Sequence, residues 1–342
     1  MQLIYDYTLK QLQDYFVSIK QKPFRAKQIF QWLYQKEVTS FSAMSDISKE
    51  LQGQLEKTHC IDYLTMQEKQ VSKDGTIKYL FVLPDGHTIE TVLMRHEYGN
   101  SLCVTTQVGC NMKCAFCASG LFRKRRNLTA GEMVVQVMKV QQDVQERISH
   151  IVVMGTGEPF DNYDNVMQFV RIINEPFGLA IGARHITIST CGMVDSIYRY
   201  KDEGLQTNLA ISLHGPNNTI RDALMPINKT YPMEVLRESL EAYIQTTNRR
   251  VTFEYILLKG VNDSIACARQ LAHYCKGLNV YVNLIPYNPV DEHGFAASDN
   301  KAREAFKAEL LRFSVNTTMR KEHGQDIDGA CGQLRAKQSE VK

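Results

Sequence analysis

Apolar residues recur at two different spacings in the first hundred positions, and the change of spacing divides this part of the chain in two. In most of residues 1–60 they recur every three or four positions, which is typical of amphipathic helices. In residues 61–98 apolar and polar positions alternate, and Pro-Asp-Gly at 84–86 separates two apolar runs as a hairpin turn would. We therefore expect a small helical N-terminal domain over residues 1–60, followed by a β-hairpin extension over 61–98. The expected helices cover 7–19, 24–36 and 40–57.

Beyond residue 98, short apolar runs alternate with amphipathic stretches in a repeated strand and helix rhythm. The expected strands cover residues 102–107, 150–155, 185–190, 209–214, 251–258 and 280–286. The amphipathic stretches between most of them cover 129–147, 162–175, 193–204, 232–247 and 263–276. This rhythm predicts an α/β fold, a partial (β/α)6 barrel of parallel strands over residues 99–335, with a polar tail at 336–342. In such folds the functional residues gather at the C-terminal ends of the strands.

Composition and charge narrow the class of protein. The chain has 342 residues, of which 44% are hydrophobic and 23% charged, as in ordinary globular proteins, and its net charge of +3 permits an RNA partner without requiring one. No segment approaches the roughly 20 apolar residues of a membrane helix, and the N-terminus is too charged for a signal peptide. We expect a cytoplasmic protein that does not contact membranes. We also expect a monomer, because no apolar surface stripe is evident.

Three closely spaced cysteines carry the strongest chemical signal. Cys110, Cys114 and Cys117 have the spacing C-x3-C-x2-C and follow the first strand of the expected barrel. Three thiolates can bind three irons of a 4Fe–4S cluster, whereas a zinc site or a structural cluster would want a fourth ligand that this segment lacks. Zinc binding, or cysteines without a metal, remain the alternatives. The spacing resembles that of the radical S-adenosylmethionine (SAM) superfamily, in which the open iron binds SAM.

Polar residues follow several of the other expected strands. After the second strand comes GTGEPF, where the glycines allow a close backbone approach and the glutamate can bind an ammonium group. This motif resembles the site for the SAM amino group in the same superfamily. Taken singly such residues are more often satisfied turn residues, but together they favour a cofactor site at the rim of the barrel. The candidate SAM-binding residues are Gly157, Glu158, Ser189, Ser212, Leu213, His214 and Asn288.

Two further segments indicate a reaction class. Cys331 lies between small residues in DIDGACGQL, and Cys103 lies seven residues before the first cysteine of the cluster motif, in LCVTTQVGC. With GTGEPF, SLH, MPIN and VNLIPYNP in order, the chain resembles the RlmN-type dual-specificity RNA methyltransferases essentially from end to end. Gly329 stands where that family usually has alanine, and Cys191 is an additional thiol that we expect to be buried.

This resemblance implies a reaction at carbon 2 of adenosine in 23S ribosomal RNA, at the peptidyl transferase centre, and in transfer RNA at position 37. In the family, the cysteine corresponding to Cys331 takes a methyl group from one SAM, and a second SAM at the cluster is cleaved to a radical that activates this methyl group. The methylene adds to the base. Cys103 then forms a transient disulfide with Cys331 and releases the RNA. Glu90 matches the family's proton acceptor, although Cys103 could also take the proton. The family implies an electron donor such as flavodoxin or ferredoxin.

Other assignments stay open from the sequence. The related Cfr-type enzymes methylate carbon 8 of the same ribosomal adenosine, and Pro159 favours the carbon 2 group. A non-catalytic iron–sulfur or zinc RNA-binding protein would have a filled fourth ligand position and would not cleave SAM. A radical SAM enzyme acting on a peptide or small molecule would leave Cys331 without a role. The target adenosine must leave its stack to reach a buried cysteine. We expect the basic run Arg123–Arg126 and the helical N-terminal domain to bind RNA phosphates.

Overall fold

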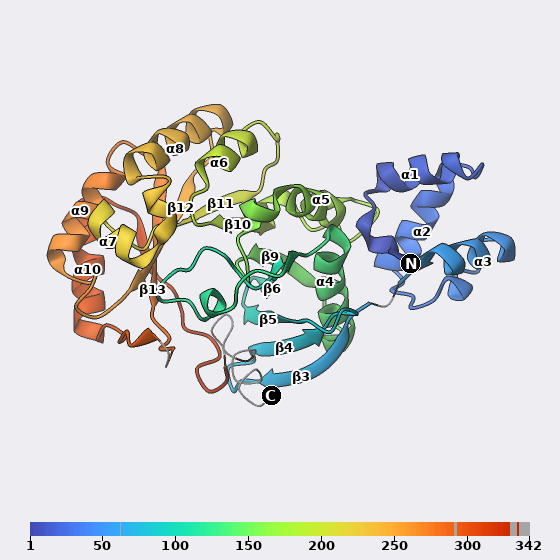
Figure 1. Ribbon diagram of the computed structural model, residues 1–342, viewed down its shortest axis with the longest axis horizontal. Coiled ribbons are helices and arrows are strands. Elements are labelled where there is room, and N and C mark those ends of the chain that lie inside the picture. The colour runs from blue at the N-terminus through green and yellow to red at the C-terminus, as the bar shows by residue number, and fades with distance from the viewer. Residues whose placement is uncertain (62, 291–292, 329–333, 335–342) are drawn as a thin grey trace.

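A small helical unit precedes the sheet in the computed structural model, which describes residues 1–61, 63–290, 293–328 and 334. In Figure 1 this unit lies to one side of the sheet. Its helices are α1 (Leu9–Ser18), α2 (Phe24–Tyr34) and α3 (Lys49–Thr58). Strand β1 (Gln2–Leu3) pairs in parallel with β2 (His59–Cys60), so the two ends of the unit meet. The predicted helical character is confirmed, but α3 begins later than expected.

Seven parallel strands form the larger part of a ten-stranded sheet (Figure 1). They are β6 (Gly99–Cys103), β9 (Ile148–Val153), β10 (Ile186–Thr190), β11 (Asn208–Ser212), β12 (Val251–Leu257), β13 (Val280–Pro286) and β14 (Thr317–Met319). The sequence predicted the first six. It missed β14, because three residues are too few to show an alternating pattern. The first strand also differs from the prediction, since it begins at Gly99 and ends at Cys103.

The predicted hairpin extension belongs to the same sheet. Its strands are β3 (Thr65–Val71), β4 (Ile77–Val82) and β5 (Thr88–His96), which pair with one another in antiparallel fashion. The predicted turn at 84–86 connects β4 to β5. Strand β5 then pairs antiparallel to β6, the first strand of the parallel set. The extension therefore continues the sheet of the barrel. A separate two-stranded sheet forms from β7 (Gln107–Val108) and β8 (Arg126–Asn127).

Helices connect the parallel strands and pack against the sheet. Five of them were predicted: α4 (Ala130–Val144), α5 (Tyr163–Asn174), α6 (Val194–Tyr200), α8 (Met233–Thr247) and α9 (Ile265–Cys275). Helix α4 begins with a capping box in which Thr129 and Glu132 each accept a backbone N–H of the other. The sequence did not predict α7 (Asn218–Leu224) or α10 (Asn300–Arg312). No helix in the described part of the chain is long and apolar enough to cross a membrane.

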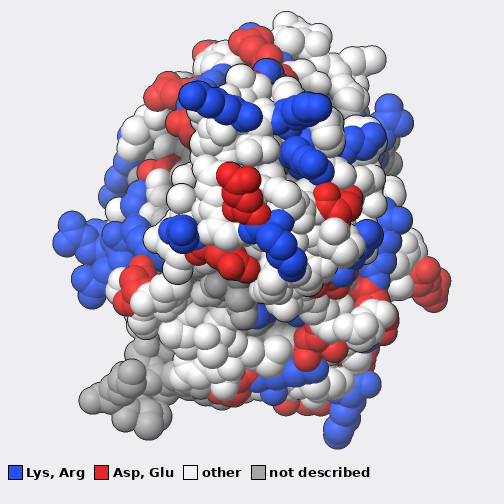
Figure 2. Space-filling view, turned by 90° about the vertical axis from the view of Figure 1, so that its right-hand side faces the viewer, with Lys and Arg blue, Asp and Glu red and all other residues white. Residues whose placement is uncertain are grey.

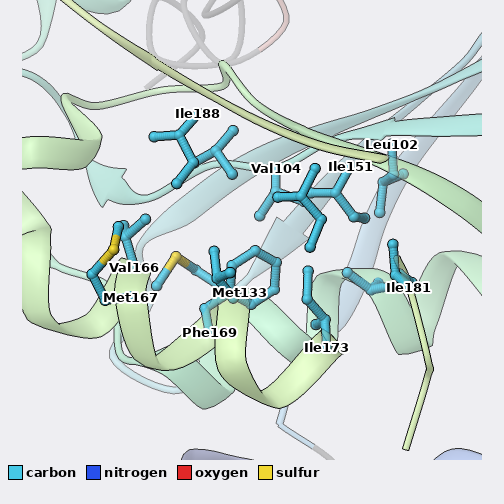
Figure 3. Close-up of a cluster of buried hydrophobic side chains, with 14 of the residues drawn as sticks. Leu102, Val104, Met133, Ile151, Val166, Met167, Phe169, Ile173, Ile181 and Ile188 are labelled. Carbon is cyan, nitrogen blue, oxygen red and sulfur yellow. The ribbon is translucent and has the colours of Figure 1, made fainter. Parts of the chain in front are cut away.

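The helix-covered face of the sheet is apolar. Leu102 of β6, Ile151 of β9 and Ile188 of β10 are fully buried, and Figure 3 shows them beside side chains of α4 and α5. Met133 and Phe169 are among the helical residues of this cluster. Burial of each such large apolar side chain contributes about 1.5–3 kcal/mol, so this layer supplies much of the stability of the fold.

The opposite face of the same strands, here called the polar face, carries polar and thiol groups beside apolar residues such as Val152. Paired residues on neighbouring strands point to the same face, as do residues two apart on one strand. Cys103 pairs with Val92 of β5, so Glu90, two residues earlier, shares its face. On the other side of β6, the strand pairings run to β9, β10 and β11 in turn. These pairings place Ser189 and Ser212 on the same face as Cys103. The sheet therefore presents a row of polar and thiol groups on the side that the helices leave uncovered.

Candidate active site

The three cysteines of the C-x3-C-x2-C motif lie in one loop after β7, where the sequence placed them. Each is half-buried. The backbone N–H of Cys117 donates to the carbonyl of Cys114 at 3.2 Å, which folds the loop into a turn. The N–H of Ala115 donates to the carbonyl of Leu224 at 2.9 Å and fixes the loop against α7. The loop is thus held by its own turn and by a helix far along the chain.

Burial raises the pKa values of two of these thiols, which affects how they could bind a metal. Burial, with a smaller effect of nearby Cys117, raises the pKa of Cys110 to about 12. Burial and the neighbouring thiols also raise the pKa of Cys114 well above its usual value. The three side chains therefore affect one another, and a bound cation would be needed to hold them as thiolates. Within the described ranges, no three His, Cys, Asp or Glu side chains are grouped as ligands of a single metal ion.

A second apolar cluster, separate from the main core, lies against the cysteine loop. Its buried members include Cys191, Leu224 and Tyr287, and Met112 and Phe116 of the loop pack against it. Such a layer keeps water away from a cluster and lowers the local dielectric constant. Cys191 is buried as predicted.

The GTGEPF loop fixes the carboxylate of Glu158 from both sides. This side chain is 3% exposed and accepts the backbone N–H of Phe160 at 2.9 Å and that of Cys191 at 2.8 Å. Burial raises the pKa of Glu158 despite these hydrogen bonds. Gly157 has φ of +111°, and a Cβ there would lie 2.7 Å from the side chains of Gln107 and Thr106. The glycine is therefore required at this point, as its place in the motif suggested.

The remaining predicted rim residues lie at the C-terminal ends of successive strands. The hydroxyls of Ser189 and Ser212 are 3.4 Å apart, although 23 residues separate them in sequence. Leu213 is fully buried, and its backbone N–H donates to the carbonyl of Glu254. Asn288 is exposed, two residues beyond the end of β13. The structure thus brings the two serines together and leaves Asn288 facing solvent on the same rim.

His214 is a neutral, structurally constrained histidine. It has φ of +55°, and its Nδ1 accepts the backbone N–H of Ile256 at 3.0 Å. Burial, with a smaller effect of Arg221, lowers the pKa of His214 to about 3. Because Nδ1 accepts, the proton of the neutral ring lies on Nε2. The ring meets Phe116 of the cysteine loop edge-on at 4.8 Å between centroids, so the two motifs are in contact.

Arg221 of α7 is a buried residue that the sequence analysis missed. It is fully buried and donates to the carbonyls of Leu213 at 3.1 Å and Cys191 at 2.7 Å, and to the side chain of Asn228 at 2.7 Å. It therefore connects the SLH, MPIN and Cys191 segments through one side chain. The MPIN motif, which contains Asn228, was the only signal in the sequence that pointed to this neighbourhood.

Glu254 on β12 is a second missed residue. It pairs in register with Ser212 and so lies on the polar face. The side chain is 5% exposed, and the amide of Asn283 donates to it at 2.9 Å. Burial raises the pKa of Glu254, partly offset by Arg320 and by the Asn283 hydrogen bond. An alternating strand pattern could have placed Glu254 on a face, but nothing local indicated that this face is enclosed.

Glu90 and Cys103 lie on the polar face of two neighbouring strands, and both are buried. The carboxylate of Glu90 forms an ion pair with Lys78 of β4 at 3.0 Å. The hydroxyl of Thr105, just beyond β6, donates to the carbonyl of Glu90 at 2.6 Å and ties the two strands together. The expected third member, Cys331, lies outside the described residues.

The basic run after the cysteine loop divides into two kinds of residue. Arg126 forms ion pairs with Asp85 at 2.6 Å and Glu132 at 2.7 Å, and Lys124 forms one with Asp161 at 2.6 Å. These two side chains are held within the protein. Arg123 and Arg125 are exposed.

Figure 2 views the protein from the side on which the helical N-terminal unit lies. Lys and Arg side chains are spread over this face among Asp and Glu, and several of them gather at its left edge. The positive charge on this face is therefore local rather than a continuous stripe.

Comparison with known proteins accounts for nearly the whole chain. Residues 3–61 match the ribosomal RNA large subunit methyltransferase N-terminal domain, and residues 104–268 match the radical SAM superfamily. A probable dual-specificity RNA methyltransferase RlmN from Geobacillus kaustophilus is 55% identical over 338 residues, covering 98% of this chain and 93% of the relative. The chain belongs to the RlmN family. The corresponding protein of Enterococcus faecalis is also 55% identical, with 98% of this chain and 96% of the relative covered.

The structure agrees with this membership. A crystal structure of a radical SAM methyltransferase from Sphaerobacter thermophilus superposes with a TM-score of 0.93 at 41% identity, and covers 97% of this chain and 99% of that one. The predicted α/β radical SAM fold and the enzyme class, a radical SAM methyltransferase, are thereby confirmed. The radical SAM family implies a 4Fe–4S cluster and SAM, and the half-buried cysteine trio is a chemically suitable place for the cluster.

Proposed function

We propose that this enzyme methylates carbon 2 of adenosine in 23S ribosomal RNA at the peptidyl transferase centre and in transfer RNA at position 37, with Cys331 carrying the methyl group. Relatives at 55% identity bear the name dual-specificity RNA methyltransferase, which supports RNA as the substrate. The position within the base and the role of Cys331 come from the resemblance of the site motifs. We also propose that the enzyme is cytoplasmic, works as a monomer and receives electrons from flavodoxin or ferredoxin.

One observation carries this proposal. Glu90 and Cys103 share one face of the sheet, and the ammonium of Lys78 contacts both Glu90 and the backbone carbonyl of Asp328, at 3.0 and 2.5 Å. Cys331 follows Asp328 by three residues, and three residues of extended chain span at most about 11 Å. The chain that leads to the proposed methyl carrier therefore passes next to the proposed proton acceptor.

The residues of the site have separate proposed roles. Cys110, Cys114 and Cys117 would hold the 4Fe–4S cluster, and the groups on the rim would hold SAM: Gly157, Glu158, Ser189, Ser212, Leu213, His214 and Asn288. Bound together, these cofactors supply the 5′-deoxyadenosyl radical. The acidic group of Glu158 is held ready for an ammonium by two backbone N–H groups.

The groups on the polar face would act on the RNA base and the methyl carrier. Glu90 is the proposed acceptor of the carbon 2 proton, and Cys103 is the alternative acceptor. Cys103 then releases the RNA by forming a disulfide with Cys331. Burial of both Glu90 and Cys103 keeps water from competing for this proton and this sulfur.

The test is a comparison of two cysteine substitutions in cells whose own enzyme has been deleted. Cys331→Ala removes the proposed methyl carrier, whereas Cys275→Ala removes a buried thiol of α9 that belongs to no site motif. We expect the unsubstituted protein and Cys275→Ala to restore 2-methyladenosine in 23S ribosomal RNA and transfer RNA, measured by mass spectrometry of nucleosides. Cys331→Ala should give none. Methylation by Cys331→Ala contradicts the proposal, and 8-methyladenosine from the unsubstituted protein would favour the Cfr-type reaction.

A further inference from the structure

The segment that precedes Cys331 is bound to the turn between β3 and β4. The backbone N–H of Gly324 donates to the carboxylate of Asp74 at 2.9 Å. Two residues on, the carboxylate of Asp326 accepts the hydroxyl of Ser72 and the backbone N–H of Lys73 at 3.1 Å. About 250 positions separate the two segments in sequence, so these contacts are decided by the tertiary fold. They hold residues 324–328 against the antiparallel extension.

The last described residue of this segment, Asp328, is fixed at three of its atoms. Its backbone N–H donates to the side-chain oxygen of Gln70 at 3.1 Å, and its carboxylate accepts the side-chain amide of the same Gln70 at 3.1 Å. Its carbonyl oxygen accepts the ammonium of Lys78 at 2.5 Å. A backbone held at its N–H, its carbonyl and its side chain has a defined position and direction.

Lys78 is an unusual residue for the place it occupies. Its side chain is completely buried, and its partner Glu90 is 4% exposed. Burial of an ammonium is costly unless opposite charge and hydrogen bonds compensate it. A packing role could be filled by an apolar residue at this position of the strand, as Leu80 does two residues later. The charge of Lys78 instead joins the carboxylate of Glu90 to the backbone of Asp328.

We propose that Lys78 is a positioning residue, which sets the place of Glu90 relative to the peptide that leads to Cys331. This inference rests on the proposed function of these two residues. In the reaction, the methyl carrier and the proton acceptor must meet the same adenine carbon. Misplacement of a catalytic group by about 1 Å can lower a rate a hundredfold. One side chain that contacts both elements fixes their separation directly, and the hydrogen bonds of Asp74, Ser72 and Gln70 keep the approaching peptide in register.

The first test needs no catalysis. Hydrogen–deuterium exchange, read by mass spectrometry on the full chain, reports the amides of Gly324 and Asp328. Lys78→Met leaves the buried carboxylate of Glu90 without its ammonium, so the informative pair is Lys78→Met/Glu90→Gln against Glu90→Gln alone. We expect exchange at Asp328 to be at least ten times faster in the double variant than in Glu90→Gln. Equal exchange in the two proteins would overturn the docking role of Lys78.

The second test measures, in the reconstituted enzyme, how closely SAM cleavage is coupled to methylation of the base. Lys78→Met is compared with Lys69→Met, a substitution on β3 of the same hairpin that removes a partly exposed ammonium paired with Asp143. We expect Lys78→Met to raise the 5′-deoxyadenosine formed per 2-methyladenosine at least tenfold, with iron content and SAM cleavage unchanged. Lys69→Met should leave the ratio as it is. An unchanged ratio in Lys78→Met, or an equal rise in Lys69→Met, would overturn the positioning role.

The two tests also separate this inference from the proposed function. If the unsubstituted protein forms no 2-methyladenosine, the proposed function fails, while hydrogen exchange still decides whether Lys78 holds Asp328. If the unsubstituted protein is active and both tests of Lys78 give the control result, only the positioning role fails.

Discussion

The parallel and antiparallel parts of the sheet build their halves of the site in different ways. In the parallel part, Glu158 lies in a loop beyond a strand end, and the backbone N–H groups of Phe160 and Cys191 fix its carboxylate. The serines of this part lie at or near the last residues of β10 and β11. In the antiparallel extension, the groups lie within the strands, and a buried ion pair between Lys78 and Glu90 fixes them.

The two parts should therefore tolerate amino-acid substitutions to different degrees. Loops at strand ends can exchange side chains without disturbing the sheet, so motifs there are compact and readable. A buried ion pair within a sheet depends on its partner strand, and removal of one member leaves an uncompensated charge. The cofactor half therefore tolerates exchange at loop positions other than Gly157 and is rigid beneath its loops, whereas the half that meets the methyl carrier depends on a few long-range contacts.

The largest effect should come from the rigid layer beneath the cofactor loops. Arg221→Met removes three hydrogen bonds, to the carbonyls of Leu213 and Cys191 and to the side chain of Asn228, and leaves the buried carbonyl of Cys191 without this donor. We expect a loss of about 3–5 kcal/mol in the free energy of unfolding, measured with urea. Lys69→Met in the extension breaks only a partly exposed ion pair and should cost about 1 kcal/mol or less. Similar losses in the two variants would contradict the contrast between the regions.

A smaller effect should appear in the pH dependence of stability. Burial lowers the pKa of His214 from 6.5 to about 3. Above about pH 6.5 the ring is neutral in both the folded and the unfolded state and contributes no pH dependence. Below it only the unfolded state binds the proton, so the free energy of unfolding falls by up to about 1.4 kcal/mol per pH unit.

The His214→Asn variant, freed of iron, isolates this contribution. Its free energy of unfolding, measured between pH 6 and pH 4.5, should decrease less steeply with falling pH than that of the unsubstituted protein under the same conditions. Parallel curves would show that His214 takes up its proton as readily in the folded state as in the unfolded one.

The smallest effect concerns RNA binding at the surface next to the cysteine loop. Arg123 and Arg125 are exposed, whereas Arg126 is held by two carboxylates. Each lost phosphate contact lowers the slope of log affinity against log salt by about 0.7–0.9. Arg123→Ala/Arg125→Ala should therefore reduce the slope by about 1.5 in a filter-binding titration with transfer RNA. Arg312→Ala, at an exposed position of α10, is the control, and equal slopes in the two variants would remove this surface from the RNA interface.

The sequence by itself determined the features that depend on local pattern. Apolar periodicity predicted the helical unit, the motif Pro-Asp-Gly predicted the turn between β4 and β5, and short apolar runs predicted six of the seven parallel strands, because each of these signals lies within the element itself. The spacing of the cysteine trio placed three thiols in one loop, since residues so close in sequence have little room to separate. The short strand β14 and the seven-residue helix α7 are too short to show such a pattern, and α10 was not predicted either.

Only the tertiary structure decided which strands meet. Pairing of β5 with β6 brought Glu90 to the face of Cys103, and docking of residues 324–328 on the extension brought Asp328 to Lys78. A buried lysine within an alternating strand has no local mark that distinguishes it from a solvent-facing one. Burial, and hence the chemistry of Lys78 and Arg221, arises from contacts between segments far apart in sequence, and a local pattern carries no information about such contacts.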